Sequence, residues 1–186
     1  MKRLFIAVKI KPGQELLNAY YGLKKDLALE KIKWVKEDNF HFTLKFLGET
    51  EELLIDKIIN TLENISLKTQ PIKLKIGNMG IFGSRYNPRV IWAGIENSTQ
   101  IDEFVNKILN KLDEAGFKRD RQNFVPHITV GRIKNVNNKR HLKNTIDKYK
   151  TSLYQEDTIN KIYLFESVLT PDGPVYKVVK KFKLGY

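Results

Sequence analysis

Six stretches of the chain have strand-like patterns of hydrophobic and polar residues, and apolar residues recur with helical spacing along four others. Alternation, in which every second side chain faces the same side, is typical of strands, whereas apolar residues three and four apart are typical of helices. The predicted strands are residues 2–10, 39–48, 71–77, 88–96, 124–132 and 158–165. The predicted helices lie within residues 14–31, 51–64, 100–117 and 138–150.

These elements follow the same order twice. Residues 41–44 read HFTL and residues 127–130 read HITV, which gives an offset of 127 − 41 = 86 between the two histidines. Each half then reads strand, helix, motif strand, helix, strand. We therefore predict an α+β fold: two pseudo-symmetric lobes, each an antiparallel-rich sheet backed by helices, with a cleft between them. The whole chain, 1–186, is predicted to be one bilobal domain with an internal repeat of roughly 1–80 and 87–170.

Two further segments contain turn-forming residues. The glycine-rich stretch GNMGIFGSRYNP (77–88) is predicted to be the loop that crosses between the lobes. The segment 167–183 is predicted to be a C-terminal hairpin that turns at Pro171-Asp172-Gly173.

Alternation along the two motif strands separates a buried face from an open face. The predicted buried residues of the first motif strand are Phe40, Phe42, Leu44 and Phe46, and those of the second are Ile128 and Val130. The opposite face carries His41, Thr43 and Lys45 in the first strand and His127 and Thr129 in the second. If the lobes face one another, two imidazoles and two hydroxyls converge in one cleft.

The composition indicates a globular protein with an affinity for polyanions. Hydrophobic residues make up 41% and charged residues 29%, and the formal net charge is +12. A field of that sign attracts nucleic acid, although a lysine-rich surface can also serve solubility or thermal stability. There are no cysteines, the basic N-terminus reads as a strand rather than a signal peptide, and no apolar run is long enough to span a bilayer. We expect a cytoplasmic protein that does not bind membranes.

Two histidines with two threonines suit phosphodiester chemistry. Histidine titrates near neutral pH, so one imidazole can accept a proton while the other donates one. Threonine hydroxyls donate hydrogen bonds to phosphoryl oxygens. A metal site is less well supported, because there is no cysteine, no HxH and no HExxH, and the third histidine, His141, lies in a predicted helix. No P-loop or G-x-G-x-x-G sequence is present. We expect no cofactor and no metal.

The chain resembles the 2H phosphoesterases, and within them the RNA 2′,3′-cyclic phosphodiesterases, historically called 2′-5′ RNA ligases. The resemblance rests on RLFIAV, HFTLKFLGE, PRVIWAG, PHITVGR and ESVLTPDGPVY. It implies hydrolysis of a terminal 2′,3′-cyclic phosphate on RNA to a 2′-phosphate. It also implies the reverse reaction, an ATP-independent joining of such an end to a 5′-hydroxyl.

The resemblance also implies roles for individual residues. His41 would donate a proton to the departing 3′ oxygen, and His127 would be the base that activates water. Thr43 and Thr129 would hold the phosphoryl oxygens. Arg132 is similar to an arginine after the second motif, but strict alternation puts it on the wrong face unless the strand ends or bulges at Gly131.

Two aromatic residues are weaker candidates for binding the substrate. Phe82, in the predicted crossing loop, would stack on a base, and Tyr176 lies in the terminal hairpin. The predicted partner is RNA with a 2′,3′-cyclic phosphate terminus, bound by a monomer. Two other functions fit the same residues: a non-catalytic module that binds RNA ends, and a phosphodiesterase for a small cyclic phosphate or a 2′-5′ linkage.

Overall fold

The computed structural model describes residues 1–96, 98–118, 124–151, 153–171 and 173–185. The strands are β1 (Lys2–Lys9), β2 (Lys31–Trp34), β3 (His41–Thr50), β4 (Ile72–Gly83), β5 (Pro88–Ile95), β6 (His127–Asn135), β7 (Gln155–Ile159), β8 (Lys161–Thr170) and β9 (Gly173–Lys183). The helices are α1 (Gln14–Asp26), α2 (Ile55–Leu67), α3 (Thr99–Glu114) and α4 (Lys139–Lys148), with short 3₁₀ turns η1 (Glu37–Asn39) and η2 (Glu52–Leu54).

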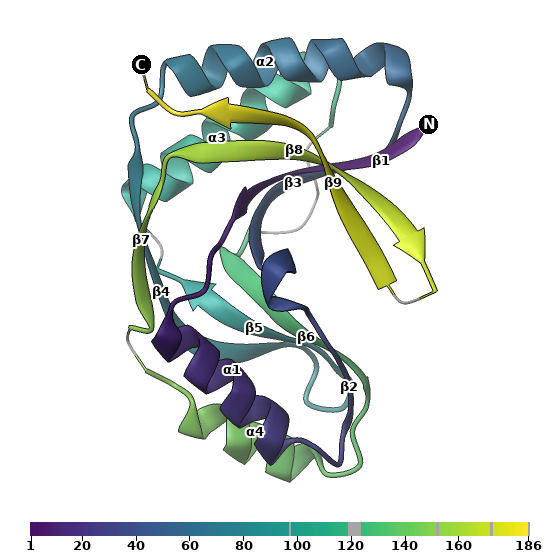
Figure 1. Cartoon of the computed structure of the whole chain (residues 1–186), viewed down its shortest axis with the longest axis vertical. Coiled ribbons are helices and arrows are strands. Elements are labelled where there is room, and N and C mark those ends of the chain that lie inside the picture. Colours follow the sequence, from purple (N-terminus) through teal and green to yellow (C-terminus); the bar gives the residue numbers. More distant parts are fainter. Residues whose placement is uncertain (97, 119–123, 152, 172, 186) are drawn as a thin grey trace.

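The described strands form one strongly bent antiparallel sheet. Its order is β7-β4-β5-β6-β3-β1-β8-β9, and β2 pairs with β6 outside this path. Strands β1, β3, β8 and β9 form an upper lobe, and β2, β4, β5 and β6, with β7 at the edge beside β4, form a lower lobe (Figure 1). The α+β class with antiparallel lobes is therefore confirmed, and the two lobes are continuous where β3 meets β6.

The lobes do not coincide with the two sequence repeats. In the upper lobe α2 packs against α3, β8 and β9, and α3 also contacts β3. In the lower lobe α1 packs against α4, which also contacts β4 (Figure 1). Helices α1 and α3 therefore each cover the lobe that holds the motif strand of the other repeat. Each lobe is built from both halves of the sequence.

The apolar faces of the helices explain their placement. The five α3 residues with helical spacing are all buried: Ile101, Phe104, Val105, Ile108 and Leu112. The hydroxyl of Ser98 accepts a hydrogen bond from the backbone N–H of Ile101, and the side chain of Asn138 does the same for His141. Such side chains satisfy backbone donors that have no partner in the first turn, so these two helices begin where the sequence supplies a cap.

The third histidine joins the two helices of the lower lobe. The Nε2 atom of His141 lies 3.0 Å from the carbonyl oxygen of Asp26, at the end of α1. The hydroxyl of Tyr149 donates a hydrogen bond to a carboxylate oxygen of Asp26, at 3.2 Å. His141 therefore has a structural role between α1 and α4, distant from the two motifs.

The glycine-rich segment 77–88 is mostly strand, and the prediction of a crossing loop there was wrong. Strand β4 continues to Gly83, and only residues 84–87 form the turn to β5. The pairing of β4 with β5 has an irregularity at Asn78, whose φ is 58°. Here Gly80 leaves space above the sheet for the ring of Trp92, whereas Gly83, with a φ of 111°, begins the turn to β5.

Two other strand predictions differ from the structure. The single strand predicted over 158–165 is the end of β7 and the start of β8, which are separated at Asn160. Strand β2 was not predicted, because its four residues are too few to give a clear alternating pattern. The predicted terminal hairpin is formed by β8 and β9, while Asp172 of its turn lies outside the described residues.

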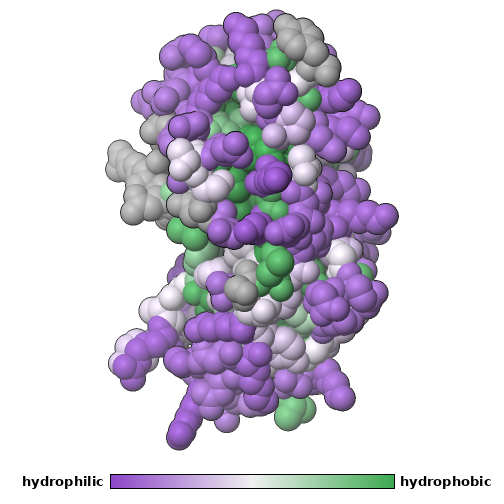
Figure 2. All heavy atoms as spheres, turned by 90° about the vertical axis from the view of Figure 1, so that its left-hand side faces the viewer, coloured by the Kyte–Doolittle hydropathy of each residue, from purple (hydrophilic) through white to green (hydrophobic). Residues whose placement is uncertain are grey.

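Hydrophilic side chains cover most of the face shown in Figure 2, and hydrophobic residues gather in one hollow of its upper half. Among the described residues, no helix is both long and apolar enough to cross a membrane.

Candidate active site

The two motif strands meet at the centre of the sheet. Strands β3 and β6 are antiparallel and pair at Phe42 and Ile128, both of which are fully buried. These two residues occupy the same position in their motifs, since 128 − 42 = 86. When equivalent residues of two antiparallel strands pair with each other, a local two-fold axis passes between them. The histidine and threonine of each motif flank this axis on the side opposite the buried pair, all of them half-buried.

A bulge lies at the last residue of each motif. In the pairing of β3 with β1, Thr43 lies opposite Ala7 and Lys45 opposite Ile6, so Leu44 is an extra residue. In the pairing of β6 with β5, Val130 is extra in the same way. An extra residue shifts the alternation by one, so that positions beyond it exchange faces.

The bulges decide which residues join the motifs on the open face. Arg132, five residues after His127, lies on the cleft side because the strand bulges at Val130, one residue before the glycine at which we expected it. The prediction for the first strand was wrong at the equivalent positions. Phe46 is 57% exposed rather than buried, and Lys45 is only 4% exposed and points into the protein. The amino group of Lys45 donates a hydrogen bond to the carbonyl oxygen of Lys118.

Both imidazoles are held in the same way. The Nδ1–H of His41 donates to the carbonyl oxygen of Asn39 at 2.6 Å, and that of His127 donates to the carbonyl oxygen of Val125 at 2.7 Å. A carbonyl oxygen only accepts, so the hydrogen of the neutral ring lies on Nδ1 in both cases. The Nε2 atom of each ring is left to exchange protons with a substrate.

The pKa values of both histidines lie below the ordinary value. Burial is the main cause for His41 and for His127, while the hydrogen bond to the backbone carbonyl partly opposes it in each. The positive charge of Arg132 lowers both pKa values further, and the proximity of His127 lowers that of His41. The two rings and the guanidinium therefore share one electrostatic environment, in which both imidazoles are neutral at neutral pH.

The two weaker aromatic candidates each contact a motif histidine. Phe82 lies edge-on to His127, with ring centres 4.7 Å apart, and it belongs to β4 rather than to a loop. Tyr176 of β9 lies edge-on to His41 at 5.2 Å. Phe5 of β1 also contacts His41, at 5.3 Å.

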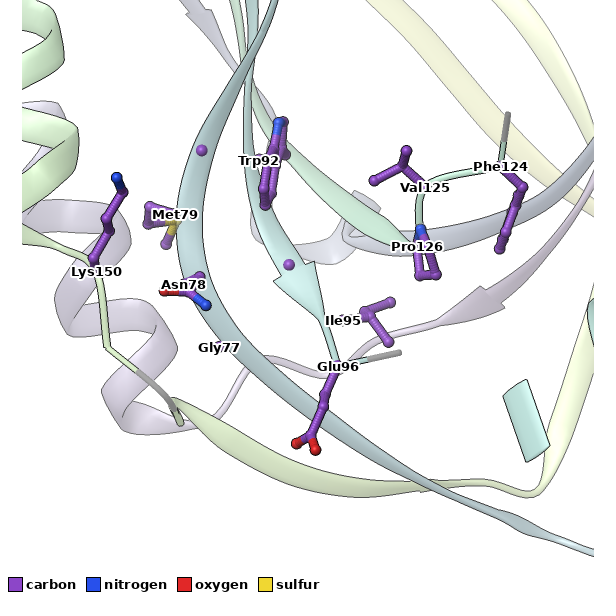
Figure 3. A pocket seen from close by; sticks show the side chains of 12 residues that line it. Gly77, Asn78, Met79, Trp92, Ile95, Glu96, Phe124, Val125, Pro126 and Lys150 are labelled. Carbon is purple, nitrogen blue, oxygen red and sulfur yellow. The ribbon is translucent and has the colours of Figure 1, made fainter. Parts of the chain in front are cut away.

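Two hollows flank the histidines. The hollow on the His41 side has a volume of about 450 Å³, and Arg3, Phe46, Arg132 and Tyr176 are among the residues that line it. The hollow on the His127 side is larger, about 1040 Å³, and is lined by residues of β4 and β5 and by residues 124–126 (Figure 3). The cleft therefore offers space on both sides of the histidine pair.

Sequence reasoning missed two residues of this region. Arg3 lines the hollow beside His41. Burial raises the pKa of Tyr176, and the positive charges of Arg132 and Arg3 act in the opposite direction. Trp92 lies on β5 opposite Thr129 and therefore on the cleft face. Trp92 was missed because the offset of 86 does not hold for β1 and β5. Ala7 pairs with Thr43 as Trp92 pairs with Thr129, so equivalent residues of β1 and β5 are 85 apart in the sequence.

The described part of the chain contains no group of three His, Cys, Asp or Glu side chains arranged to hold a metal ion. The candidate site consists instead of two imidazoles, two hydroxyls, a guanidinium and aromatic rings. This set can exchange protons and bind an anion.

A family model described as LigT like Phosphoesterase matches residues 8–92 and 95–176, and each segment contains one histidine motif. The RNA 2′,3′-cyclic phosphodiesterase of Methanocaldococcus jannaschii is 38% identical over 97% of this chain and 99% of that protein. The protein of the same name from Aquifex aeolicus is 37% identical over 88% of each chain.

Solved structures share the fold. The crystal structure of TT0787 from Thermus thermophilus has a TM-score of 0.77 at 24% identity and covers 98% of this chain and 97% of its own. Escherichia coli LigT complexed with 3′-AMP has a TM-score of 0.73 at 19% identity, with 98% of each chain covered.

Proposed function

Because the chain belongs to the LigT-like phosphoesterase family, we propose that it is an RNA 2′,3′-cyclic phosphodiesterase, a hydrolase that opens a terminal cyclic phosphate to a 2′-phosphate. The observation that carries the proposal is the position of the two motifs on either side of the Phe42–Ile128 pair, where both imidazoles face one cleft. The names of the relatives supply the substrate class. The positive net charge of +12 suits a polyanionic substrate.

In the proposed mechanism, which needs no metal, the histidines act as a base and an acid. Nε2 of His127 removes a proton from the attacking water, and the new P–O bond forms as the P–O3′ bond breaks. His41 delivers a proton from its Nε2 to the departing O3′. Each transfer contributes about 10²- to 10⁴-fold to the rate.

The lowered pKa values suit the base and impose a condition on the acid. A neutral His127 is ready to accept a proton at neutral pH. His41 must be protonated to act, and the nearby Arg132 opposes this. The negative charge of a bound phosphodiester favours the imidazolium, so substrate binding itself supplies the proton donor.

The remaining polar groups would bind the phosphoryl group. Thr43 and Thr129 each lie two residues from their histidine on the same face, so their hydroxyls can donate to the two non-bridging oxygens. Arg132 would stabilise the charge that develops on these oxygens, as fixed donors do in other phosphoryl and acyl transfers. Phe82 and Tyr176 would hold the imidazoles and nucleoside in place.

The same geometry permits the reverse reaction. A 5′-hydroxyl that replaces water would attack the cyclic phosphate and give a 2′-5′ linkage without ATP. Both histidines come from a single chain, so a monomer suffices.

The test uses an oligonucleotide that ends in a 2′,3′-cyclic phosphate, incubated with the protein and EDTA. We expect conversion to the 2′-phosphate, a fall of about 10²-fold or more in His41→Ala and in His127→Ala, and near-normal turnover in His141→Ala. The last is the matched control, because His141 contacts Asp26 away from the cleft.

Other outcomes distinguish the alternatives. Turnover that requires a metal would contradict the mechanism. Tight binding of the RNA end with no turnover across a broad pH range would favour a non-catalytic module. Preferential use of a small cyclic phosphate or a 2′-5′ dinucleotide in competition with the oligonucleotide would change the substrate but keep the site.

A further inference from the structure

Part of the lining of the larger hollow lies on the same face of the sheet as His127. In the β5–β6 ladder Gly94 lies opposite His127, and Trp92 lies opposite Thr129. In the β4–β5 ladder Gly80 lies opposite Trp92. Residues opposite one another in antiparallel strands face the same side. The hollow therefore extends across β5 and β4 beside His127 and Thr129, which lie opposite two of its lining residues, Gly94 and Trp92.

The floor of this hollow is an aromatic ring supported by glycines. A Cβ added at Gly80 would lie 2.1 to 2.6 Å from three ring atoms of Trp92, and one added at Gly94 would lie 3.1 Å from another. The indole therefore rests directly on the backbone of β4 and β5, where no other residue type would leave it room. The ring of Phe82 lies beside it, with centres 5.1 Å apart, and joins it to His127.

The opposite wall is apolar and partly open to solvent. It is formed by Phe124, Val125 and Pro126, which immediately precede His127 (Figure 3). Phe124 is 36% exposed and Val125 is 47% exposed, although both are large apolar residues. A flat aromatic floor and an apolar wall suit a planar ligand that stacks.

The charged groups at the rim are already paired. The amino group of Lys150 lies 2.7 Å from a carboxylate oxygen of Asp147, and a carboxylate oxygen of Glu96 lies 3.7 Å from the amino group of Lys75. The hollow is therefore poorly suited to a phosphate, and its lining favours an uncharged ring. In a protein that acts on RNA, the uncharged and planar ligand is a nucleobase. Stacking of bases on aromatic side chains is a general mode of binding.

We infer that this hollow binds the nucleobase of the nucleoside whose 5′-hydroxyl replaces water as the nucleophile. The inference rests on the proposed function and on its assignment of His127 as the base. In an in-line displacement the attacking and leaving oxygens lie on opposite sides of the phosphorus. The terminal ribose leaves through O3′ beside His41, where the smaller hollow lies. The nucleophile therefore approaches beside His127, and the nucleoside that carries it extends over Trp92.

The reaction balances without a further reactant. The O5′–P bond forms and the P–O3′ bond breaks. The proton of the 5′-hydroxyl passes to His127, and His41 gives a proton to O3′. The products are a 2′-5′ phosphodiester and a free 3′-hydroxyl, so this second nucleoside binds as an acceptor in joining and as a leaving group in the cleavage of a 2′-5′ linkage.

Binding can be measured through Trp92 itself. The chain has two tryptophans, so Trp34→Phe leaves Trp92 as the reporter. The probe is 5′-deoxyadenosine, which has the base but lacks the 5′-hydroxyl that would act as the nucleophile. 2′-AMP is present to occupy the hollow beside His41. We expect saturable quenching in Trp34→Phe, with the half-saturating concentration raised about tenfold when Phe124→Ala is added. The matched control is Tyr86→Ala, since Tyr86 is 70% exposed in the turn after β4.

Turnover gives the second test. Adenosine 2′,3′-cyclic phosphate is the donor, adenosine is the acceptor, and the ratio of 2′-5′ product to 2′-AMP is followed as adenosine increases. We expect the ratio to saturate, and Phe124→Ala to raise the half-saturating adenosine concentration about tenfold, while Tyr86→Ala leaves it unchanged.

The possible outcomes distinguish a failure of the acceptor-site inference from a failure of the proposed function. If the wild-type protein does not hydrolyse the donor at all, the proposed function fails. If hydrolysis is normal but 5′-deoxyadenosine does not quench Trp92, the hollow is not an acceptor site. If instead Phe124→Ala raises KM for a dinucleotide donor but not for the mononucleotide, the hollow holds the preceding nucleotide of the donor strand, and our assignment is overturned.

Discussion

Replacing Gly80 by alanine tests the support of the Trp92 ring. The nearest ring atom lies 2.1 Å from the position of an added Cβ, and ordinary contact begins at 3.4 Å, so the ring must retreat by 3.4 − 2.1 = 1.3 Å. Overpacking of this kind costs about 1–3 kcal/mol of unfolding free energy. For a chain of this length the melting temperature should fall by about 2–12 °C.

The sign of the effect should reverse when the ring is removed. The φ angle of Gly80 is not among the positive ones, so its backbone accepts alanine without strain. Alanine also restricts the unfolded chain, which stabilises a protein by about 0.4–1 kcal/mol where the native conformation is compatible. We therefore expect Gly80→Ala to be destabilising in the wild-type background and neutral or stabilising in a Trp92→Leu background.

The assay is urea unfolding followed by far-ultraviolet circular dichroism, which does not depend on tryptophan. The four proteins of the cycle give the coupling free energy between Gly80 and Trp92. An equal cost of Gly80→Ala in both backgrounds would refute the contact between the glycine and the ring. A neutral effect in the wild-type background would refute it as well.

Two further predictions concern the electrostatics of the cleft. Because the pKa values of His41 and His127 are both lowered from 6.5, the bell-shaped pH profile of kcat/KM, which reports the free protein, should have its optimum below pH 6.5. The optimum of kcat should lie higher, since the bound phosphodiester raises both pKa values; a kcat/KM optimum above neutral pH would contradict this reading. Removing the charge in Arg132→Gln should reduce kcat by about 10²-fold and shift the kcat/KM optimum upward, because the guanidinium lowers both histidine pKa values. Arg140→Gln, the same charge change on the exposed start of α4, should do neither in the same steady-state assay, and equal effects of the two variants would point to net charge alone.

The repeat carried most of what could be predicted from the sequence. Two motifs in matching places gave the α+β class, the antiparallel lobes and the proximity of His41 to His127. These features depend on side-chain alternation and on the order of elements, both of which are visible in a single sequence. The resemblance to the 2H phosphoesterases supplied the activity, which alternation alone does not specify.

The sequence did not reveal the two bulges. A bulge adds one residue to one strand of a ladder, and neither Leu44 nor Val130 differs in type from an ordinary strand residue. Strict alternation therefore assigned Phe46 to the core and left Arg132 on the wrong face. Both errors have one cause, and the equivalence of Leu44 and Val130 shows that the irregularity is part of the repeat.

Glycines were the other source of error. The stretch from Gly77 to Gly83 has the composition of a loop, yet it lies in β4, and its Gly80 supports Trp92. Whether a glycine serves a turn or the close approach of a side chain depends on the neighbouring strand. That information lies in the tertiary structure.

The exchange of helices between the repeats affects the order in which the chain can fold during its synthesis. The first motif strand leaves the ribosome early, but α3, which packs against it, comes from the second repeat, and α1 must wait for α4. Strands β7 to β9, residues 155–183, complete both lobes. Elements whose partners are distant in sequence form late, because long loops must close first. Although the chain contains two copies of one pattern, neither copy completes a lobe alone, and we expect the cleft to form only after β9 has been synthesised.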